Sequence, residues 1–365
     1  FYGCSELSSV TFESPSALTS IKVHAFDNCA ALQAIAIPDS VTSIEGYAFS
    51  NSGLRSITIP AQVKELGSYV FAGCTSLETV IFAEGSMITR LPEGVFNGCT
   101  SLVSVNIPET ATEIGAWAFY KCSALPSITI PDGVESIGEN ALRSCTSLTS
   151  MTIPVSVTEL GEHVFSECRS LETVTFAEGS TITRIPGDAF SECTSLVSVN
   201  VPETVTEIGE YAFCACSALP SITIPANVAS IGYGAFLDCY ALATIINEYD
   251  GIQTIGTYAF YDCGLYAGTE KRAFASTANT SFIQAARAAG YRVNYTVSFV
   301  IDGVEVESYE EVPYNSTIEA PDPEEEPDAI FDGWYTEAEL VNKWDFAENK
   351  VTDDITLYAK WWKAV

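Results

Sequence analysis

The sequence is poor in several residue types on which common functions depend. Among 365 residues it has two histidines, two methionines, and 16 lysines and arginines against 47 aspartates and glutamates, which leaves a formal net charge of −31 at pH 7. A chain this acidic repels nucleic acid and anionic lipid, so we expect neither as a partner. No apolar run is long enough to span a bilayer, and the sequence therefore predicts no membrane insertion.

Signatures of catalysis are also missing. The two histidines, His24 and His163, stand at the same position of an internal repeat but several repeats apart, so they cannot share a metal or form a proton relay. The sequence has no glycine-rich phosphate loop and no nucleophile motif. We expect a protein that is not an enzyme and that has no cofactor and no metal. A glycan-processing enzyme with a carboxylate pair hidden among its many acids is the least favoured alternative.

Repetition is what the sequence has in abundance. An anchor residue, aromatic in all units but one, returns every 22 to 25 residues within the unit L-x-x-I-x-I-P-x-x-V-x-x-I-G-x-x-A-F-x-x-C. Residues 77–119 match residues 171–213 at 31 of 43 positions, which indicates duplication of a four-unit block. The twelve anchors are Phe1, Phe26, Phe49, Phe71, Phe96, Phe119, Leu142, Phe165, Phe190, Phe213, Phe236 and Phe260. Because Phe1 falls inside a unit, we expect the chain to be a fragment of a longer array.

This period predicts one coil of a leucine-rich solenoid. In residues 102–108, apolar side chains alternate with Asn106, as in a strand buried on one face, and Pro108 ends the strand because proline cannot donate a ladder hydrogen bond. Residues 116–122 suit a short helical turn with Phe119 pointing inward. The expected fold is an α/β solenoid, a right-handed leucine-rich repeat array of about 12 coils over residues 1–265.

The cysteines follow the same period. Of 12 cysteines, 11 stand three residues after the anchor, and Ser52 takes that place in the twelfth unit. A position that accepts serine needs a small, weakly polar buried group, and parallel side chains in a column favour neither disulfides nor a tetrahedral zinc site. We predict a structural ladder made by Cys29, Cys74, Cys99, Cys122, Cys145, Cys168, Cys193, Cys216, Cys239 and Cys263, with Cys4 at its start.

The repeat unit resembles that of the BspA-like, or Treponema-type, leucine-rich repeat family of bacterial surface proteins. The resemblance covers about residues 1–265. It implies a location at the cell surface or outside the cell and a role in adhesion to host or neighbouring cells, and it names no ligand.

Residues 266–293 lose the repeat and predict a helical cap. Ser281 begins and Gly290 ends a helical pattern, and Phe282 would cover the apolar face of the last coil. Residues 294–365 predict a small mainly-β module with strands at 295–303 and 355–362.

The motifs "VPYNST", "FDGWYT" and "KWDF" between those two strands resemble the Listeria–Bacteroides repeat, a β-grasp-like module of bacterial surface proteins. In so small a module, aromatic residues such as Trp334 and Trp344 are expected to form the core. The acidic run at 322–328 lacks the ligand spacing of a calcium loop and predicts a solvated linker.

Two surfaces of the array are candidates for binding. The position two residues before the anchor carries aromatic residues in many units, and these are the candidate binding residues: Tyr47, Tyr69, Trp117, Tyr211 and Tyr258. Stacking of each ring on its neighbour explains the same pattern without a ligand. The strand face offers columns of serine and threonine hydroxyls as a second candidate.

These observations predict a monomeric, non-catalytic surface or secreted protein that binds a host or bacterial surface protein or glycan. The alternative is a spacer that projects other domains and has no ligand of its own.

Overall fold

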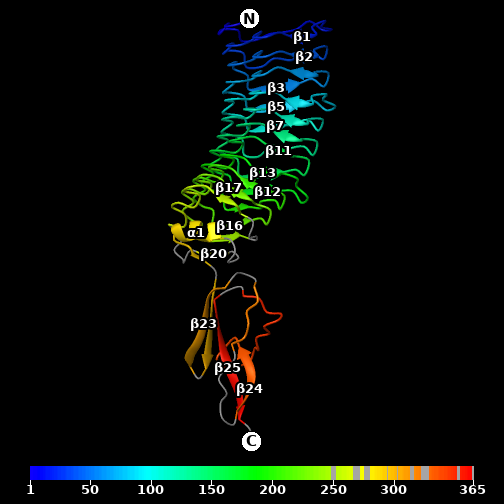
Figure 1. Ribbon diagram of the computed structural model, residues 1–365. Coiled ribbons are helices and arrows are strands. Elements are labelled where there is room, and N and C mark those ends of the chain that lie inside the picture. The colour runs from blue at the N-terminus through cyan, green and yellow to red at the C-terminus, as the bar shows by residue number, and fades with distance from the viewer. Residues whose placement is uncertain are drawn as a thin grey trace.

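Stacked coils of parallel strands form most of the molecule, and a small β domain follows them at the C-terminal end (Figure 1). The computed structural model describes residues 1–247, 252–265, 272–274, 280–293, 295–301, 303–312, 316–321, 329–351 and 354–363. The acidic run at 322–328 lies outside the described residues.

Most coils contribute strands to two ladders, each made of three separate sheets within which neighbouring strands pair parallel and in register. The first ladder contains β3 (Ser56–Ile59), β5 (Thr79–Phe82), β7 (Ser104–Asn106), β10 (Ser150–Ile153), β12 (Thr173–Phe176), β14 (Ser198–Val199), β16 (Ser221–Ile224), β18 (Thr244–Asn247), β20 (Arg272–Phe274) and β21 (Arg292–Val293). The second contains the two-residue strands β1 (Ser20–Ile21), β2 (Ser43–Ile44), β4 (Glu65–Leu66), β6 (Arg90–Leu91), β8 (Glu113–Ile114), β9 (Ser136–Ile137), β11 (Glu159–Leu160), β13 (Arg184–Ile185), β15 (Glu207–Ile208), β17 (Ser230–Ile231) and β19 (Thr254–Ile255).

The expected count of twelve coils is not confirmed. The second ladder has eleven strands in the described part of the chain. The first anchor, Phe1, is 67% exposed, whereas the anchors from Phe26 onward are buried.

Strand burial follows the predicted alternation. In β10 the side chains of Met151 and Ile153 are buried while Ser150 and Thr152 are exposed. Pro154 follows β10 directly, and the strand ends there because proline has no N–H group to donate. One face of each strand therefore enters the core and the other carries hydroxyl groups to the surface.

The predicted helical turn at the anchor is wrong, and with it the α/β class: the fold is a β-solenoid. In residues 115–122 alternate N–H groups bond in two directions. The N–H groups of Ala118, Tyr120 and Cys122 donate to carbonyls three residues earlier. Those of Trp117, Phe119 and Lys121 donate to the next coil. A helix needs every N–H group for its own turn, so bonding between coils excludes it.

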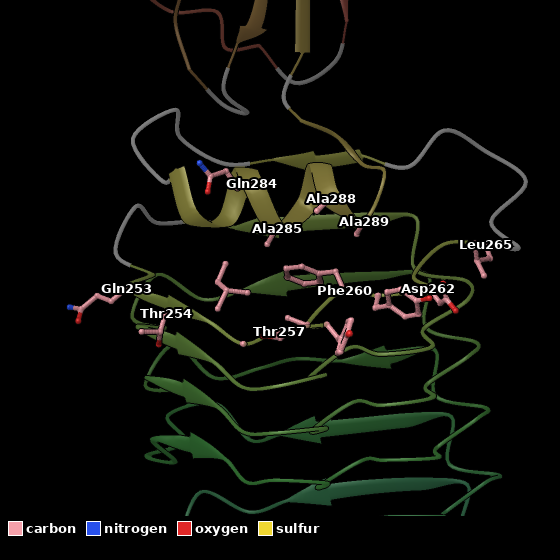
Figure 2. A pocket seen from close by; sticks show the side chains of 15 residues that line it. Gln253, Thr254, Thr257, Phe260, Asp262, Leu265, Gln284, Ala285, Ala288 and Ala289 are labelled. Carbon is pink, nitrogen blue, oxygen red and sulfur yellow. The ribbon is translucent and has the colours of Figure 1, made fainter.

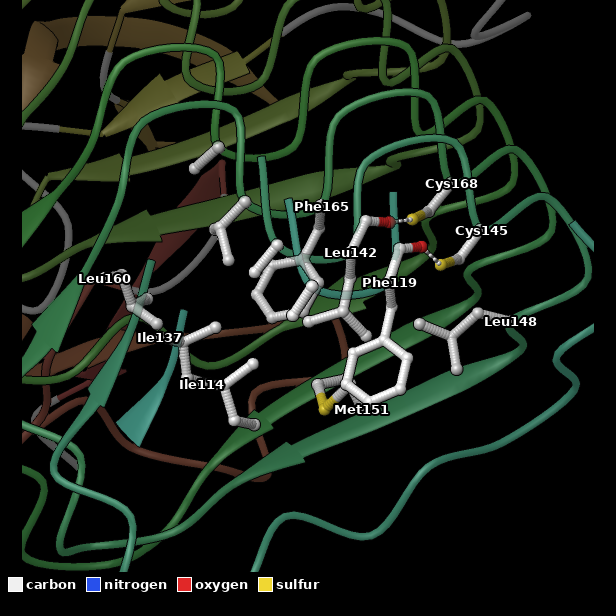
Figure 3. Close-up of a cluster of buried hydrophobic side chains, with 14 of the residues drawn as sticks. Ile114, Phe119, Ile137, Leu142, Cys145, Leu148, Met151, Leu160, Phe165 and Cys168 are labelled. Atoms are coloured by element: carbon white, nitrogen blue, oxygen red, sulfur yellow. Dashed lines mark hydrogen bonds between the residues drawn. The ribbon is translucent and has the colours of Figure 1, made fainter. Parts of the chain in front are cut away.

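The anchors fill the middle of one continuous core. Phe96 and Phe119 stack with ring centroids 5.4 Å apart, and Leu142 interrupts the column before Phe165 and Phe190 stack at 5.5 Å. Figure 3 shows Phe119, Leu142 and Phe165 side by side between the two ladders. The core continues through neighbouring coils from Ile21 to Tyr291.

The expected helical cap over residues 266–293 is not confirmed. Among the described residues helix is limited to the nine residues of α1 (Thr280–Ala288), and β20 and β21 continue the first ladder instead. Phe282 packs edge-on against Phe260 at 5.8 Å. Gly290 takes φ 82° just after α1, as a glycine that ends a helix does.

The C-terminal domain is a mixed four-stranded sheet in the order β23-β22-β25-β24. β22 (Tyr295–Ile301) and β23 (Val304–Val312) form a hairpin, β25 (Ile355–Lys363) runs parallel to β22, and β24 (Ala329–Tyr335) runs antiparallel to β25. Trp334 and Trp344 are buried in its core with Phe299, as the sequence predicts.

Candidate functional site

The aromatic column lies on backbone that is left-handed in every coil. The five candidate residues Tyr47, Tyr69, Trp117, Tyr211 and Tyr258 have φ between 52° and 60°. So do the other residues of the column, which are His24, Gly94, Asn140, His163, Asp188 and Gly234. A left-handed residue with a side chain costs roughly 1–2 kcal/mol, least for glycine, asparagine and aspartate. The backbone of the column therefore does not explain its aromatic rings.

At the N-terminal end the rings form a stack. His24 and Tyr47 are stacked with centroids 5.1 Å apart, and Tyr47 and Tyr69 follow at 5.2 Å. Tyr69 lies over Gly94, where an added Cβ would come within 2.2 Å of the ring. The Tyr69 hydroxyl donates to the Glu93 carboxylate at 2.7 Å, and burial together with this bond raises the pKa of Tyr69 to about 12. Tyr47 is 39% exposed, so the stack keeps one open face.

The remaining candidates do not continue that stack. Trp117 packs edge-on against Tyr120 of its own turn at 4.9 Å. Asn140, His163 and Asp188 occupy the next three coils, and His163 Nδ1 lies 3.8 Å from Asp188 Oδ2. The structure therefore brings Tyr47 and Tyr69 together and leaves Trp117 outside their stack.

A second aromatic cluster lies at the C-terminal end. Tyr233 packs edge-on between Tyr211 and Tyr258 at 5.3 and 5.6 Å, and Tyr261 packs on Tyr258 at 5.3 Å. Sequence reasoning missed Tyr233 because it stands one residue before the column. The signal was Gly234, which leaves room for the Tyr211 ring. Tyr258 and Tyr261 are 51% and 53% exposed.

The cysteine column is a row of hydrogen-bond donors inside the core. Each thiol donates to the carbonyl oxygen of the preceding coil's anchor, as Cys145 does to Phe119 at 3.2 Å and Cys168 to Leu142 at 3.2 Å (Figure 3). Ser52 contacts the Cys74 thiol at 3.3 Å. All twelve cysteines are free thiols, and those from Cys29 to Cys263 in the column are buried. Cys4, at the first position, is exposed.

Charge on the solenoid is arranged across coils. Arg184 contacts Glu162 at 2.9 Å and Glu207 at 3.1 Å, and Arg143 contacts Glu167 at 2.6 Å. Bonding to Arg143 lowers the pKa of Glu167. Such half-exposed pairs add little stability but hold side chains of neighbouring coils in register.

In the described part of the chain no helix is long and apolar enough to cross a membrane.

Comparison with protein families matches both parts of the chain. Residues 1–88, 85–182 and 179–285 match the BspA-type leucine-rich repeat region, in six copies. Residues 295–360 match the Listeria–Bacteroides repeat domain.

Similar proteins are bacterial. A leucine-rich repeat protein from Bacteroides ovatus is 27% identical over 80% of this chain and 79% of that one, with a TM-score of 0.64. One from Eubacterium ventriosum shares the fold at 23% identity and a TM-score of 0.51, over 68% of this chain and 74% of that one. A putative membrane protein of Evansella cellulosilytica is 43% identical over 67 residues, which are 18% of this chain.

This chain spans a tenth of the length of that Evansella relative. With its repeats, its stacked coils and both family matches in agreement, the chain belongs to the BspA-type leucine-rich repeat family and carries a Listeria–Bacteroides repeat domain after the array.

Proposed function

We propose that this protein is a non-catalytic bacterial surface or secreted protein that binds a host or neighbouring-cell protein or glycan through its repeat array. The observation that carries the proposal is the aromatic column. Tyrosine and tryptophan occupy left-handed positions where glycine, asparagine and aspartate of neighbouring coils fit at lower cost. Rings that the backbone does not require, several of them half exposed, are typical of a recognition surface.

The surface location is supported by the family. BspA-type repeats with a trailing Listeria–Bacteroides repeat domain suit a protein displayed outside the cell, and the Evansella relative is named a putative membrane protein. The acidic chain, at −31, favours a partner that is neutral or basic. We propose that the protein acts as a monomer.

A double substitution tests the proposal without disturbing the backbone. Tyr47→Asn with Tyr69→Asn removes the two stacked rings and keeps a residue type that the same column accepts at Asn140. We expect binding to a glycan array or to a panel of matrix proteins to be lost while the melting temperature changes by a few degrees or less. Met87→Asn is the control, because Met87 is 51% exposed and lies outside the aromatic column, and it should leave binding unchanged.

The alternative is a spacer, and one observation favours it: the core is continuous from Ile21 to Tyr291, as a stiff rod requires. A spacer has no ligand of its own. If the intact chain captures nothing on either panel, the spacer is the better description. If the double variant binds as the parent does, the aromatic column is a packing element and the binding site is assigned to the hydroxyl-bearing strand face instead.

A further inference from the structure

The turns around the anchors form a stack with one direction. In each turn three N–H groups, at the anchor and two residues on either side, donate to carbonyls of the following coil. In the coil before the last, Gly234, Phe236 and Asp238 donate to the carbonyls of Thr257, Ala259 and Tyr261 at 3.0, 2.8 and 3.0 Å. All these donors point toward the C-terminal end, so the stack ends in a row of donors.

That row is open in the part of the chain that the structure describes. The N–H groups of Tyr258, Phe260 and Asp262 are the next three donors, and none has an acceptor within the described ranges. Their neighbours Ala259, Tyr261 and Cys263 bond within the turn as in every other coil. Backbone donors without acceptors are rare at buried residues such as Phe260, which is 2% exposed, because each forfeits a hydrogen bond to water.

The row faces a cavity of about 850 Å³ between the last turn and α1. Figure 2 shows α1 above the Phe260 ring, with Ala285 and Ala289 turned toward it. Ala288 and Gln284 also line the cavity, so three of the four residues on this wall are alanines. Tyr258, Tyr261 and Leu265 line the other side and are 51%, 53% and 57% exposed.

We propose that this edge binds a polypeptide segment of a partner protein, which enters the cavity as one more turn of the stack and supplies three backbone carbonyls to the row. Amide carbonyls two residues apart are the acceptors that complete the same row in the inner coils. Addition of a segment to an open backbone edge is a known mode of peptide recognition. A free oxyanion fits less well, since one anion cannot span three donors and Asp262 lies beside them.

The side chains around the row indicate what the segment carries. Aromatic rings of neighbouring coils pack with their centroids 5.1 to 5.6 Å apart, as His24 does with Tyr47 and Tyr233 with Tyr258. An aromatic or apolar side chain beside Tyr258 would therefore extend the cluster. A basic side chain would suit Asp262 and the net charge of −31. This inference concerns a different surface from the Tyr47–Tyr69 stack, and either one stands if the other fails.

Amide chemical shifts of the full chain test the proposal directly. The probe is a capped synthetic peptide with the sequence of residues 114–125, the turn that completes the row of the coil before it and that carries Trp117 and Lys121 at the places of Tyr258 and Asp262. Adding it to 15N-labelled protein should move the amide protons of Tyr258, Phe260 and Asp262 downfield in a saturable way. The equivalent amides of Tyr211, Phe213 and Ala215 are already bonded and should not move.

Two variants and two further additions make the result decisive. Ala288→Trp fills the cavity and should weaken binding of the peptide at least about tenfold. Val155→Trp adds the same ring at an exposed position elsewhere and should change nothing. The proposal is overturned if a scrambled peptide gives the same shifts, if none moves, or if sodium sulfate alone moves them. Shifts that appear on raising the protein concentration without peptide would assign the edge to a second copy and overturn it as well.

Discussion

At the scale of single residues, the cysteine column shows how one small donor can be required in every coil. The Phe119 carbonyl accepts the Cys122 N–H within its own turn, and the Cys145 thiol of the next coil donates to the same oxygen. A side chain at this position must be small, buried and able to donate. Serine is also small and able to donate, and Ser52 is buried at this position with its hydroxyl 3.3 Å from the Cys74 thiol. The sequence predicted the ladder correctly in kind, but the acceptor could be identified only from the structure.

Paired substitutions at Cys145 separate the donor from the volume. Cys145→Ser keeps a donor and should lower the free energy of unfolding by about 1 kcal/mol or less. Cys145→Ala removes the donor and leaves a void, and should cost about 2 kcal/mol. Chemical denaturation under reducing conditions measures both. An alanine variant as stable as the serine variant would show that the thiol hydrogen bond contributes nothing.

The buried thiols also predict a dependence on alkaline pH. Burial raises the pKa of Cys74 to about 11 and that of Cys168 to about 12, from an ordinary value of 9.0. Below pH 9 both folded and unfolded chains keep these protons, so stability should not depend on them. Above it the unfolded chain releases protons that the folded chain holds, so stability falls as pH rises, by up to about 1.4 kcal/mol per pH unit for each thiol.

Melting temperatures at pH 7, 8, 9 and 10, with reductant present, measure this loss. We expect little change up to pH 8 and a steep fall from 9 to 10. Cys145→Ser should make the fall shallower by one thiol, since serine does not titrate in this range. A melting temperature that stays level to pH 10 would contradict the prediction.

At the scale of the element, the strands were predictable and the anchor turn was not. Alternation of apolar and polar residues placed strands at 102–108, 295–303 and 355–362, close to β7, β22 and β25. In the turn, an aromatic residue, Trp117, and a basic residue, Lys121, take positive φ, which their types do not suggest. The N–H groups of these two residues donate to carbonyls of the next coil, and those bonds hold the conformation. The sequence of a single repeat does not reveal bonds that form between repeats.

Asn106 gives a second case in which a polar residue does more than face solvent. Its side-chain Oδ1 accepts from the Phe82 N–H at 2.8 Å and its Nδ2 donates to the Phe82 carbonyl at 2.8 Å. Asn200 makes the same pair of bonds to Phe176. The amide thus replaces a strand bond between coils, and the strand pattern alone does not distinguish this from ordinary exposure.

Close packing between coils predicts opposite outcomes for two nearby glycines. An added Cβ at Gly161 would lie 2.2 Å from the Glu139 nitrogen of the preceding coil, whereas at Gly133 the nearest atom, the Ala111 carbonyl oxygen, is 3.2 Å away. Gly161→Ala should therefore cost about 3 kcal/mol, because the backbone of one coil must move. Gly133→Ala should stay within about 1 kcal/mol of the parent. Thermal melts compare the two, and equal losses would mean that the coils separate more easily than their contacts indicate.

At the scale of the whole molecule, the repeat made the solenoid predictable while the sites depend on where the repeat changes. The aromatic column was visible in the sequence as five residues, yet the structure divides it into an N-terminal stack, an isolated Trp117 and a C-terminal cluster that includes Tyr233. The column is divided because some coils carry glycine or a short polar residue at the position where a neighbouring coil carries a ring. The N–H groups of Tyr258, Phe260 and Asp262, which have no acceptor among the described residues, are open because the stack of turns ends there.

Stacking also determines how damage travels through the rod. Phe119 is fully buried and stacks on Phe96, while its N–H donates to Ala141 and its carbonyl accepts the Cys145 thiol. Phe119→Ala should cost about 3–5 kcal/mol through the cavity it leaves. Because coils contact only their neighbours, hydrogen exchange should speed up first at residues 91–165 and later at coils near either end. Val103→Ala, at a side chain that is 47% exposed, is the control and should leave exchange unchanged. If Phe119→Ala melts as the parent does, the anchor column is not the source of stability, and the polar bonds between turns hold the coils together without it.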